Sequence, residues 1–137
     1  RPLQISENEI REHQPVLVKQ VVTEKTAKTM AQLMRDVVHG TIYHGARLKE
    51  HTVAGKTGTT IVSSESGYDF NTTIASFAGF VPYESPAVSI LVKIDTPEGD
   101  LRLGGQVAAP VFAKIAKEIM AYKQIPSSYD LVAINEN

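Results

Sequence analysis

Apolar side chains recur along this chain with two different periods, and the longer period predicts a helix. From Glu24 to about His39 apolar residues return every three or four positions, at Ala27, Met30, Ala31, Met34, Val37 and Val38. This spacing is typical of an amphipathic helix that lies on a core. Thr23 suits the N-cap, because its hydroxyl can accept hydrogen bonds from first-turn amides. Gly40 suits the end of the helix.

Three later segments have the composition and period of strands. They run from about His51 to Thr60, from Thr72 to Val81, and from Ala87 to Ile94, the last being almost continuously apolar. A polar loop at 63–67 and a Pro-bounded turn at 82–86 join them. Connections this short predict an antiparallel meander.

The two ends of the chain add a hairpin and a second helix. Segment 1–22 predicts a hairpin, with a polar turn at 6–9 and a β-branched strand at 15–22. After a Pro- and Gly-containing loop at 95–105, Pro110 suits a first helical turn. An apolar stripe follows it, at Val111, Phe112, Ile115, Ile119 and Met120. The fold class is therefore α+β, with one unit over 1–126 and a tail over 127–137.

Composition narrows the possible functions without deciding between them. The 137 residues have 42% hydrophobic and 21% charged content, as in ordinary globular domains. The net charge of −1 gives no indication of a nucleic-acid partner. There is no cysteine, and the four histidines lack metal-ligand spacing, so we expect no metal or other cofactor. No apolar run is long enough for a membrane span, and no signal peptide opens the sequence.

The stretch Gly55-Lys56-Thr57-Gly58-Thr59 holds the candidate chemistry. A phosphate loop would need glycine at position 50, which is Glu50, and we reject it. Two interpretations remain. One is the Lys-Thr-Gly motif of penicillin-binding proteins and serine β-lactamases. The other is an edge strand with a solvated lysine and threonines chosen for strand propensity.

Strand geometry makes the first interpretation specific. Alternation places Lys56 and Gly58 on one face and Thr57 and Thr59 on the other. We therefore expect a twist at the glycine if the lysine and both threonines are to serve one cleft. Gly58 itself lets another group approach the backbone closely.

Several further blocks resemble one family in order and spacing. The chain resembles the C-terminal part of the transpeptidase domain of class B penicillin-binding proteins, the division and elongation enzymes that cross-link peptidoglycan. The resemblance covers about residues 15–126. Its blocks are Val21–Ala27, Val53–Thr59, Gly67-Tyr68, Ala75–Pro82, Gly104–Phe112 and Ile125-Pro126.

The resemblance implies a penicillin-binding-protein and serine β-lactamase-like fold, and a serine D,D-transpeptidase that acts through an acyl-enzyme. Its ligands would be the D-Ala-D-Ala end of a peptidoglycan stem peptide and β-lactams. By position, Lys56 would lie beside the serine of the family's middle motif. The hydroxyls of Thr57 and Thr59 would bind the substrate carboxylate, and the Thr59 N–H would be an oxyanion donor. Gly58 would leave room for substrate.

The chain departs from the family pattern at the nucleophile. No serine has a lysine three residues later, and Ser6-Glu7-Asn8, the literal Ser-x-Asn match, lies only about fifty residues before Lys56. We interpret that tripeptide as a coincidence. We therefore expect an N-terminal remainder, present as a separate chain, to supply the nucleophile and to cover apolar surface of the sheet. The resemblance further implies an extracytoplasmic location with a membrane anchor upstream.

Two alternatives stay open. The chain could be a β-lactamase or β-lactam sensor domain, although its 104–112 block is of the penicillin-binding type. It could also be a non-catalytic binding or scaffold domain that keeps the sheet without the chemistry.

Overall fold

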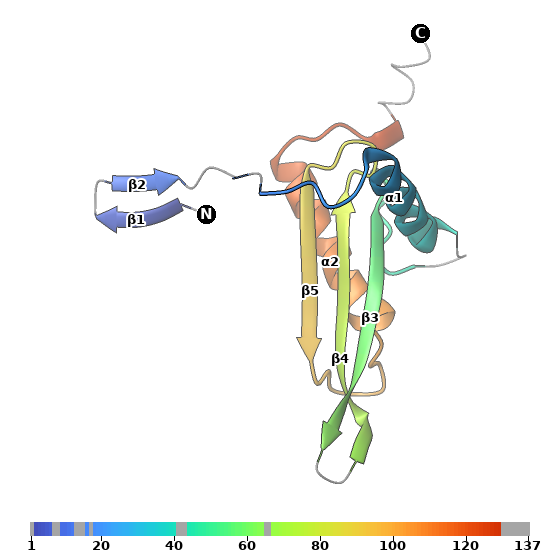
Figure 1. Ribbon diagram of the computed structural model, residues 1–137. Helices are drawn as coiled ribbons and strands as arrows, with labels where there is room; N and C mark the ends of the chain where they lie inside the picture. Colours follow the sequence, from blue (N-terminus) through green and yellow to red (C-terminus); the bar gives the residue numbers. More distant parts are fainter. Residues whose placement is uncertain are drawn as a thin grey trace.

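The computed structural model describes residues 2–6, 9–12, 16, 18–40, 44–64 and 67–129. Its elements in chain order are β1 (Pro2–Ser6), β2 (Glu9–Glu12), α1 (Glu24–His39), β3 (Ala54–Ser64), β4 (Gly67–Val81), β5 (Val88–Asp95) and α2 (Gly104–Tyr122). The last three strands form an antiparallel sheet in the order β3-β4-β5, and β1 pairs with β2 in a separate hairpin (Figure 1). The predicted α+β class and meander are confirmed.

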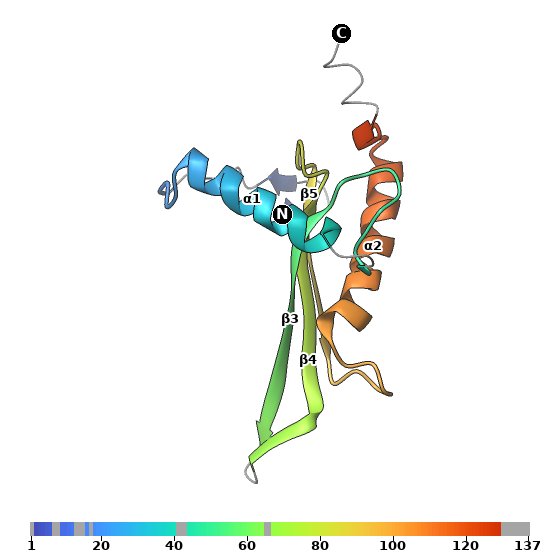
Figure 2. The same ribbon diagram turned by 90° about the vertical axis from the view of Figure 1, so that its right-hand side faces the viewer.

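Helix α2 packs against the sheet and creates the core. Viewed along the sheet, α2 lies on one side and most of α1 on the other (Figure 2). Phe77 of β4 and Phe112 of α2 are fully buried, and their rings meet edge to face with centroids 4.7 Å apart. This is the favoured geometry for an aromatic pair. The rest of the core is mostly small or β-branched: Val38, Ala46, Val53, Val81, Val92, Ala108, Ala109, Ala116 and Met120.

Helix α1 has the predicted ends but not the predicted packing. Thr23 Oγ1 accepts a hydrogen bond from Thr26 N–H at 3.1 Å, and the Gly40 N–H donates to the Asp36 carbonyl at 2.7 Å. Along the apolar stripe, however, only Val38 is buried, while Met30 remains 51% exposed. The expectation that this stripe lies on a core is wrong for the described part of the chain. The helix packs on the sheet mainly through β3, and beyond it Arg35 lies over the ring of Tyr83 at 5.4 Å, so most of the stripe stays uncovered in the described part of the chain.

The N-terminal hairpin is shorter than predicted. Its second strand is β2 (Glu9–Glu12), and the predicted strand at 15–22 is wrong, because residues 16 and 18–22 form no strand. Val18 and Val21 are 91% and 82% exposed. Their β-branched side chains favour extended backbone, but a strand also requires a partner that supplies hydrogen bonds and cover.

Strands β3 and β4 continue through much of the predicted loop at 63–67. Ser63 pairs with Tyr68 and Ser64 with Gly67, so a long two-stranded arm extends beyond β5 (Figure 1). The register shifts between Ile61 and Val62. Such an irregularity bends a ribbon and increases its twist.

Helix α2 begins at Gly104, so the prediction that Pro110 lies in its first turn is wrong. The side chain of Gln106 caps the helix, since Oε1 accepts from the N–H groups of Arg102 and Leu103 at 3.3 and 3.2 Å. Alanines and Phe112 face the sheet, whereas Val111 and Ile115 of the predicted stripe are 40% and 39% exposed.

Part of the segment expected to be a tail is bound to the domain. Ser128 is only 2% exposed. Its N–H donates to the Glu50 carbonyl at 2.9 Å, and its hydroxyl accepts from the Thr52 N–H at 3.0 Å and donates to the Glu84 carboxylate at 3.0 Å. These bonds fasten the chain after α2 to the segment that leads into β3. Residues 130–137 lie outside the described part.

Candidate functional site

The Lys-Thr-Gly motif lies on β3, at one edge of the sheet. Lys56 pairs with Ala78 of β4, and Gly58 pairs with Ser76. On its other side, β3 has no strand partner among the residues that the structure describes. Lys56 and Thr59 are exposed and Thr57 is half-buried. The motif therefore borders solvent along the open edge of the strand.

The predicted alternation of side chains is present. Thr57 and Thr59 point to the α2 side, since Thr59 contacts Gly104 and the methyl of Thr57 lies beside Gly105. Lys56 starts on the other face and turns back over the strand edge. Its Nζ donates to the Thr57 carbonyl at 3.0 Å and to Thr57 Oγ1 at 3.3 Å. The flexible lysine side chain thus brings its charge to Thr57 across the strand edge, whereas the expected twist at the glycine stays a prediction.

The start of α2 is docked directly on this motif. The Gly104 N–H donates to Thr59 Oγ1 at 3.1 Å. Gly104 is buried, and a β-carbon there would overlap the carbonyl oxygens of Ser76 and Gly58. Only glycine permits this close approach of helix to sheet. Gly104 belongs to the Gly104–Phe112 block of the family resemblance, and the sequence alone assigned it no role. Its only local signal is the Gly104-Gly105 pair ahead of an apolar helix.

Gly58 is restricted by its neighbour on β4. A β-carbon on Gly58 would lie 2.5 Å from the hydroxyl oxygen of Ser76. The Ser76 hydroxyl occupies the space next to Gly58, and the role of Gly58 in leaving room for a substrate stays a prediction.

Two histidines lie close to the motif, and sequence reasoning missed both. His44 stacks at a tilt on Phe77 with ring centroids 5.7 Å apart, and its Nδ1 accepts from the Ala46 N–H at 3.2 Å. Burial, followed by the positive charge of Arg47, lowers the pKa of His44, and Lys56 contributes to the shift. The ring is therefore more readily neutral. Sequence spacing could not identify His44, because it lies ten residues before β3 and belongs to no motif with Lys56.

His39 connects the end of α1 to the start of β3. Its Nε2 accepts a hydrogen bond from the Val53 N–H at 3.2 Å. Burial lowers the pKa of His39, and Arg47 lowers it further. Arg47 in turn donates to the carbonyls of Val38 and His39 at 2.9 and 2.7 Å. This network fixes the entry of the chain into the motif strand.

Other types of site find no support among the described residues. They contain no group of three or more His, Asp or Glu side chains able to hold a metal ion. No helix in this part has the length and apolar character needed to cross a membrane. The Ser6-Glu7-Asn8 tripeptide falls at the hairpin turn, where Glu7 and Asn8 lie outside the described residues.

Comparison with known proteins identifies the family. The model of the penicillin-binding protein transpeptidase domain matches residues 2–117. This chain belongs to that family. The match includes β3 with the Lys-Thr-Gly motif, the start of α2 and most of its length.

Individual relatives place it among the class B penicillin-binding proteins. Stage V sporulation protein D of Bacillus subtilis is 32% identical over 114 residues, 83% of this chain and 18% of that protein. Peptidoglycan D,D-transpeptidase FtsI of Buchnera aphidicola subsp. Schizaphis graminum is 35% identical over 126 residues, 91% of this chain and 22% of that protein. This chain thus spans about a fifth of the length of these relatives.

Solved structures of penicillin-binding proteins share its fold. The transpeptidase domain of penicillin-binding protein 3 from Burkholderia pseudomallei superposes with a TM-score of 0.75 at 27% identity, covering 87% of this chain and 37% of that one. Penicillin-binding protein 3 of Mycobacterium tuberculosis, solved in complex with ampicillin, gives 0.68 at 28% identity, covering 79% and 26%. The sheet and helices described above are therefore part of a penicillin-binding transpeptidase domain.

Proposed function

We propose that this chain is the C-terminal portion of a peptidoglycan D,D-transpeptidase domain, and that Lys56, Thr57, Gly58 and Thr59 form one wall of its active site. The supporting observation is the hydrogen bonding of the two threonine hydroxyls. The oxygen of Thr57 accepts from Lys56 Nζ, and the oxygen of Thr59 accepts from the Gly104 N–H. Each hydroxyl therefore keeps its own proton free to donate to a ligand.

This arrangement suits a carboxylate. Two donating hydroxyls and a lysine ammonium would hold the terminal carboxylate of a D-Ala-D-Ala stem peptide, or the carboxylate of a β-lactam, along the open edge of β3. The Thr59 N–H is proposed as an oxyanion donor, and Gly58 as the position over which the substrate lies. A donor of this type contributes about 2.7–4 kcal/mol to transition-state stabilisation.

The nucleophile is proposed to come from the remaining part of the domain. Its serine oxygen would attack the penultimate D-Ala carbonyl and form an ester as the terminal D-Ala leaves. An amine of a second stem peptide would then take the acyl group and release the serine. A β-lactam would acylate the same serine by ring opening. Lys56 would stabilise negative charge beside the proton-transferring groups of the missing part.

The exposed apolar surface supports a missing part. Leu91 on β5 is 69% exposed, and Met30 and Leu33 on α1 are 51% and 54% exposed. Large apolar side chains gathered on a surface usually mark a place that another protein segment covers. We propose that the remainder of the transpeptidase domain covers them, and that the complete protein acts outside the cytoplasm, anchored upstream in the membrane.

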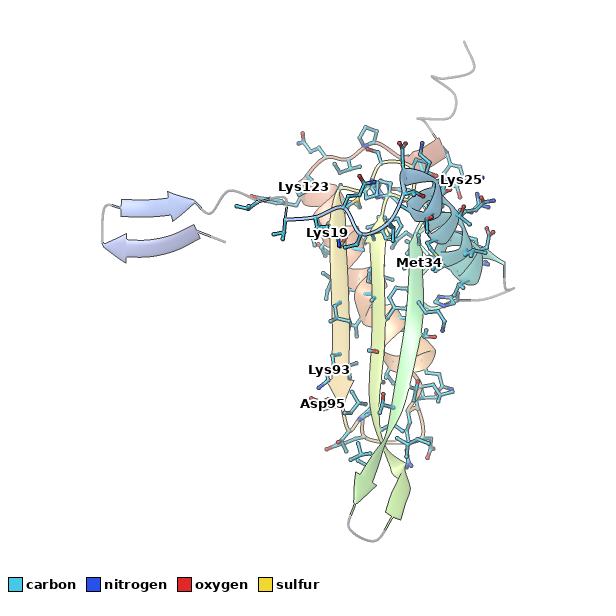
Figure 3. All side chains as sticks on the ribbon, viewed as in Figure 1. Lys19, Lys25, Met34, Lys93, Asp95 and Lys123 are labelled. Carbon is cyan, nitrogen blue, oxygen red and sulfur yellow. The ribbon has the colours of Figure 1, made fainter. Side chains whose placement is uncertain are left out.

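The test is the rate of acylation by a fluorescent penicillin after the chain is combined with the remaining part of the domain. We expect Lys56→Ala to slow acylation by about a hundredfold or more, as removal of a charge-stabilising group does. Lys93→Ala is the matched control, because Lys93 is exposed on β5 and pairs with Asp95 at 2.7 Å, near the lower end of the strand in Figure 3. Equal rates for the two variants would reject the proposed role of Lys56.

A further inference from the structure

A cavity of about 520 Å³ lies between the 47–51 segment and α2. Figure 2 shows the segment that leads into β3 passing beside this helix, and residues of both line the cavity. None of the motif residues Lys56–Thr59 lines the cavity. Leu91, Met30 and Leu33, which the remaining part of the domain is proposed to cover, do not line it either. We name it the α2 cavity.

The lining of the α2 cavity combines apolar and cationic side chains. Leu48, Met120 and Ile125 contribute apolar surface, and Met120 is only 2% exposed. The lining includes four cationic side chains and only one carboxylate, that of Glu50. The whole chain, in contrast, has a net charge of −1. Positive charge is therefore concentrated around an apolar hollow.

Two of these cations are placed together by helix geometry. Lys114 and Lys117 are three residues apart on α2 and therefore lie on one helix face. Both are exposed, as is Lys49 on the opposite wall. Arg47 adds charge at one end while its guanidinium donates to the carbonyls of Val38 and His39.

A buried histidine gives an independent indication of a binding site. His51 lines the cavity and is only 7% exposed. Its Nδ1 is buried and makes no hydrogen bond within the described part of the chain. Buried polar atoms in native proteins are nearly always paired, and an unpaired one calls for an explanation. A ligand head group that shifts the 47–51 segment slightly would supply the partner.

We propose that the α2 cavity binds a small amphipathic anion, with a single apolar chain against Met120 and a carboxylate beside Lys114 and Lys117. The volume falls within the roughly 300–1,000 Å³ of small-molecule sites, which are mostly apolar with a few placed polar groups. The excess of cations selects an anion over a neutral or cationic amphiphile. Since His51 and Thr52 lead directly into β3, an occupied cavity would also stabilise the entry to the Lys-Thr-Gly strand.

The test is calorimetric titration of the 137-residue chain with dodecanoate below its micelle concentration. We expect one saturable site, with binding about tenfold weaker in Lys114→Gln/Lys117→Gln because two charge contacts are lost. Lys123→Gln is the control, since this exposed lysine, labelled in Figure 3, caps the end of the same helix and does not line the cavity. Ala121→Trp, which fills the cavity from an exposed lining position, should abolish binding without removing charge.

Three results of the calorimetric titration would overturn the proposal. They are the absence of saturable binding, equal weakening in the Lys123→Gln control, and equal affinity for dodecyltrimethylammonium. Vesicles that contain phosphatidylglycerol distinguish a membrane surface from a free amphiphile. Binding to those vesicles without binding to monomeric dodecanoate would also reject the site. Neither titration depends on penicillin acylation, so this proposal can fail while the proposed function stands.

Discussion

The hydroxyl of Thr59 accepts a hydrogen bond from the backbone N–H of Gly104 at 3.1 Å, and this bond joins two segments that are 45 residues apart in the sequence. It attaches the first residue of α2 to the strand that carries Lys56. The donor would otherwise be one of the unpaired amides of a helix start. The candidate site and the packing of the last helix therefore depend on the same contact.

Gly104→Ala should destabilise the domain by about 1–3 kcal/mol, the usual cost of overpacking a rigid contact. The new methyl group would overlap two backbone carbonyl oxygens, those of Ser76 and Gly58, which side-chain rotation cannot relieve. Urea denaturation followed by circular dichroism measures the change. Gly105→Ala is the matched control. Its β-carbon would lie 3.6 Å from the Thr57 methyl, an ordinary contact, so its stability should stay equal or rise. If Gly104→Ala and Gly105→Ala lost the same stability, overlap with the Ser76 and Gly58 carbonyls would not be the cause of the loss.

Thr59→Val should cost about 1 kcal/mol of stability, because the buried Gly104 loses its acceptor. Thr59→Ser retains the hydroxyl and should retain most of the stability. The same pair separates the structural from the proposed binding role. In the combined domain, Thr59→Val should slow penicillin acylation by more than its loss of stability explains. If a stably folded Thr59→Val were acylated by penicillin at the unaltered rate, the Thr59 hydroxyl would have no role in the proposed site.

Gly58→Ala and Ser76→Ala should be coupled. Alanine at position 58 alone places its β-carbon 2.5 Å from Ser76 Oγ, whereas the next nearest atom, Ser76 Cβ, is 3.9 Å away. Removing the hydroxyl should therefore relieve most of the conflict. A double-mutant cycle in urea should give a favourable interaction free energy of at least about 0.5 kcal/mol. Strictly additive effects would show that the two residues do not meet.

Stability should fall as the solution becomes acidic. The pKa of His39 and that of His44 are lowered from 6.5 in the folded chain, mainly by burial. Below about pH 6.5 the unfolded state therefore binds protons that the folded state does not, and the free energy of unfolding decreases until the folded pKa values are passed. Above pH 6.5 both states are neutral and this contribution is fully present.

Urea midpoints between pH 5 and 8 measure this dependence. His39→Gln offers an amide oxygen to the Val53 N–H without a titrating group, so its curve should be flatter than that of the unaltered chain. A curve just as steep would assign the dependence to other groups.

Local sequence was sufficient for elements whose ends are set by their own residues. Thr23 and Gly40 determine the limits of α1 through bonds within a few positions, and the two-residue period of β3 placed Thr57 and Thr59 together. The start of α2 was mispredicted because its cause is not local. Gly104 begins the helix where it fits against Gly58 and Ser76, which sequence spacing alone does not bring near.

The packing of α1 and the position of Lys56 Nζ were missed for different reasons. The apolar stripe of α1 correctly indicated a helix. A stripe shows only that one face of a helix is suited to burial. It does not show which other segment packs against that face. The fold-back of Lys56 onto Thr57 depends on the choice among side-chain rotamers at a strand edge. Residue type alone does not determine that choice.

The central proposal is that this chain supplies the Lys-Thr-Gly wall and that the remaining part of the domain supplies the nucleophile. Intact-mass analysis tests it most directly, after a labelled penicillin is added to the chain alone and to the chain with the remaining part of the domain. We predict no added mass on the 137-residue chain in either sample, and one penicillin on the companion only when both are present. Label on this chain itself, or equal labelling of the companion without it, would contradict the account.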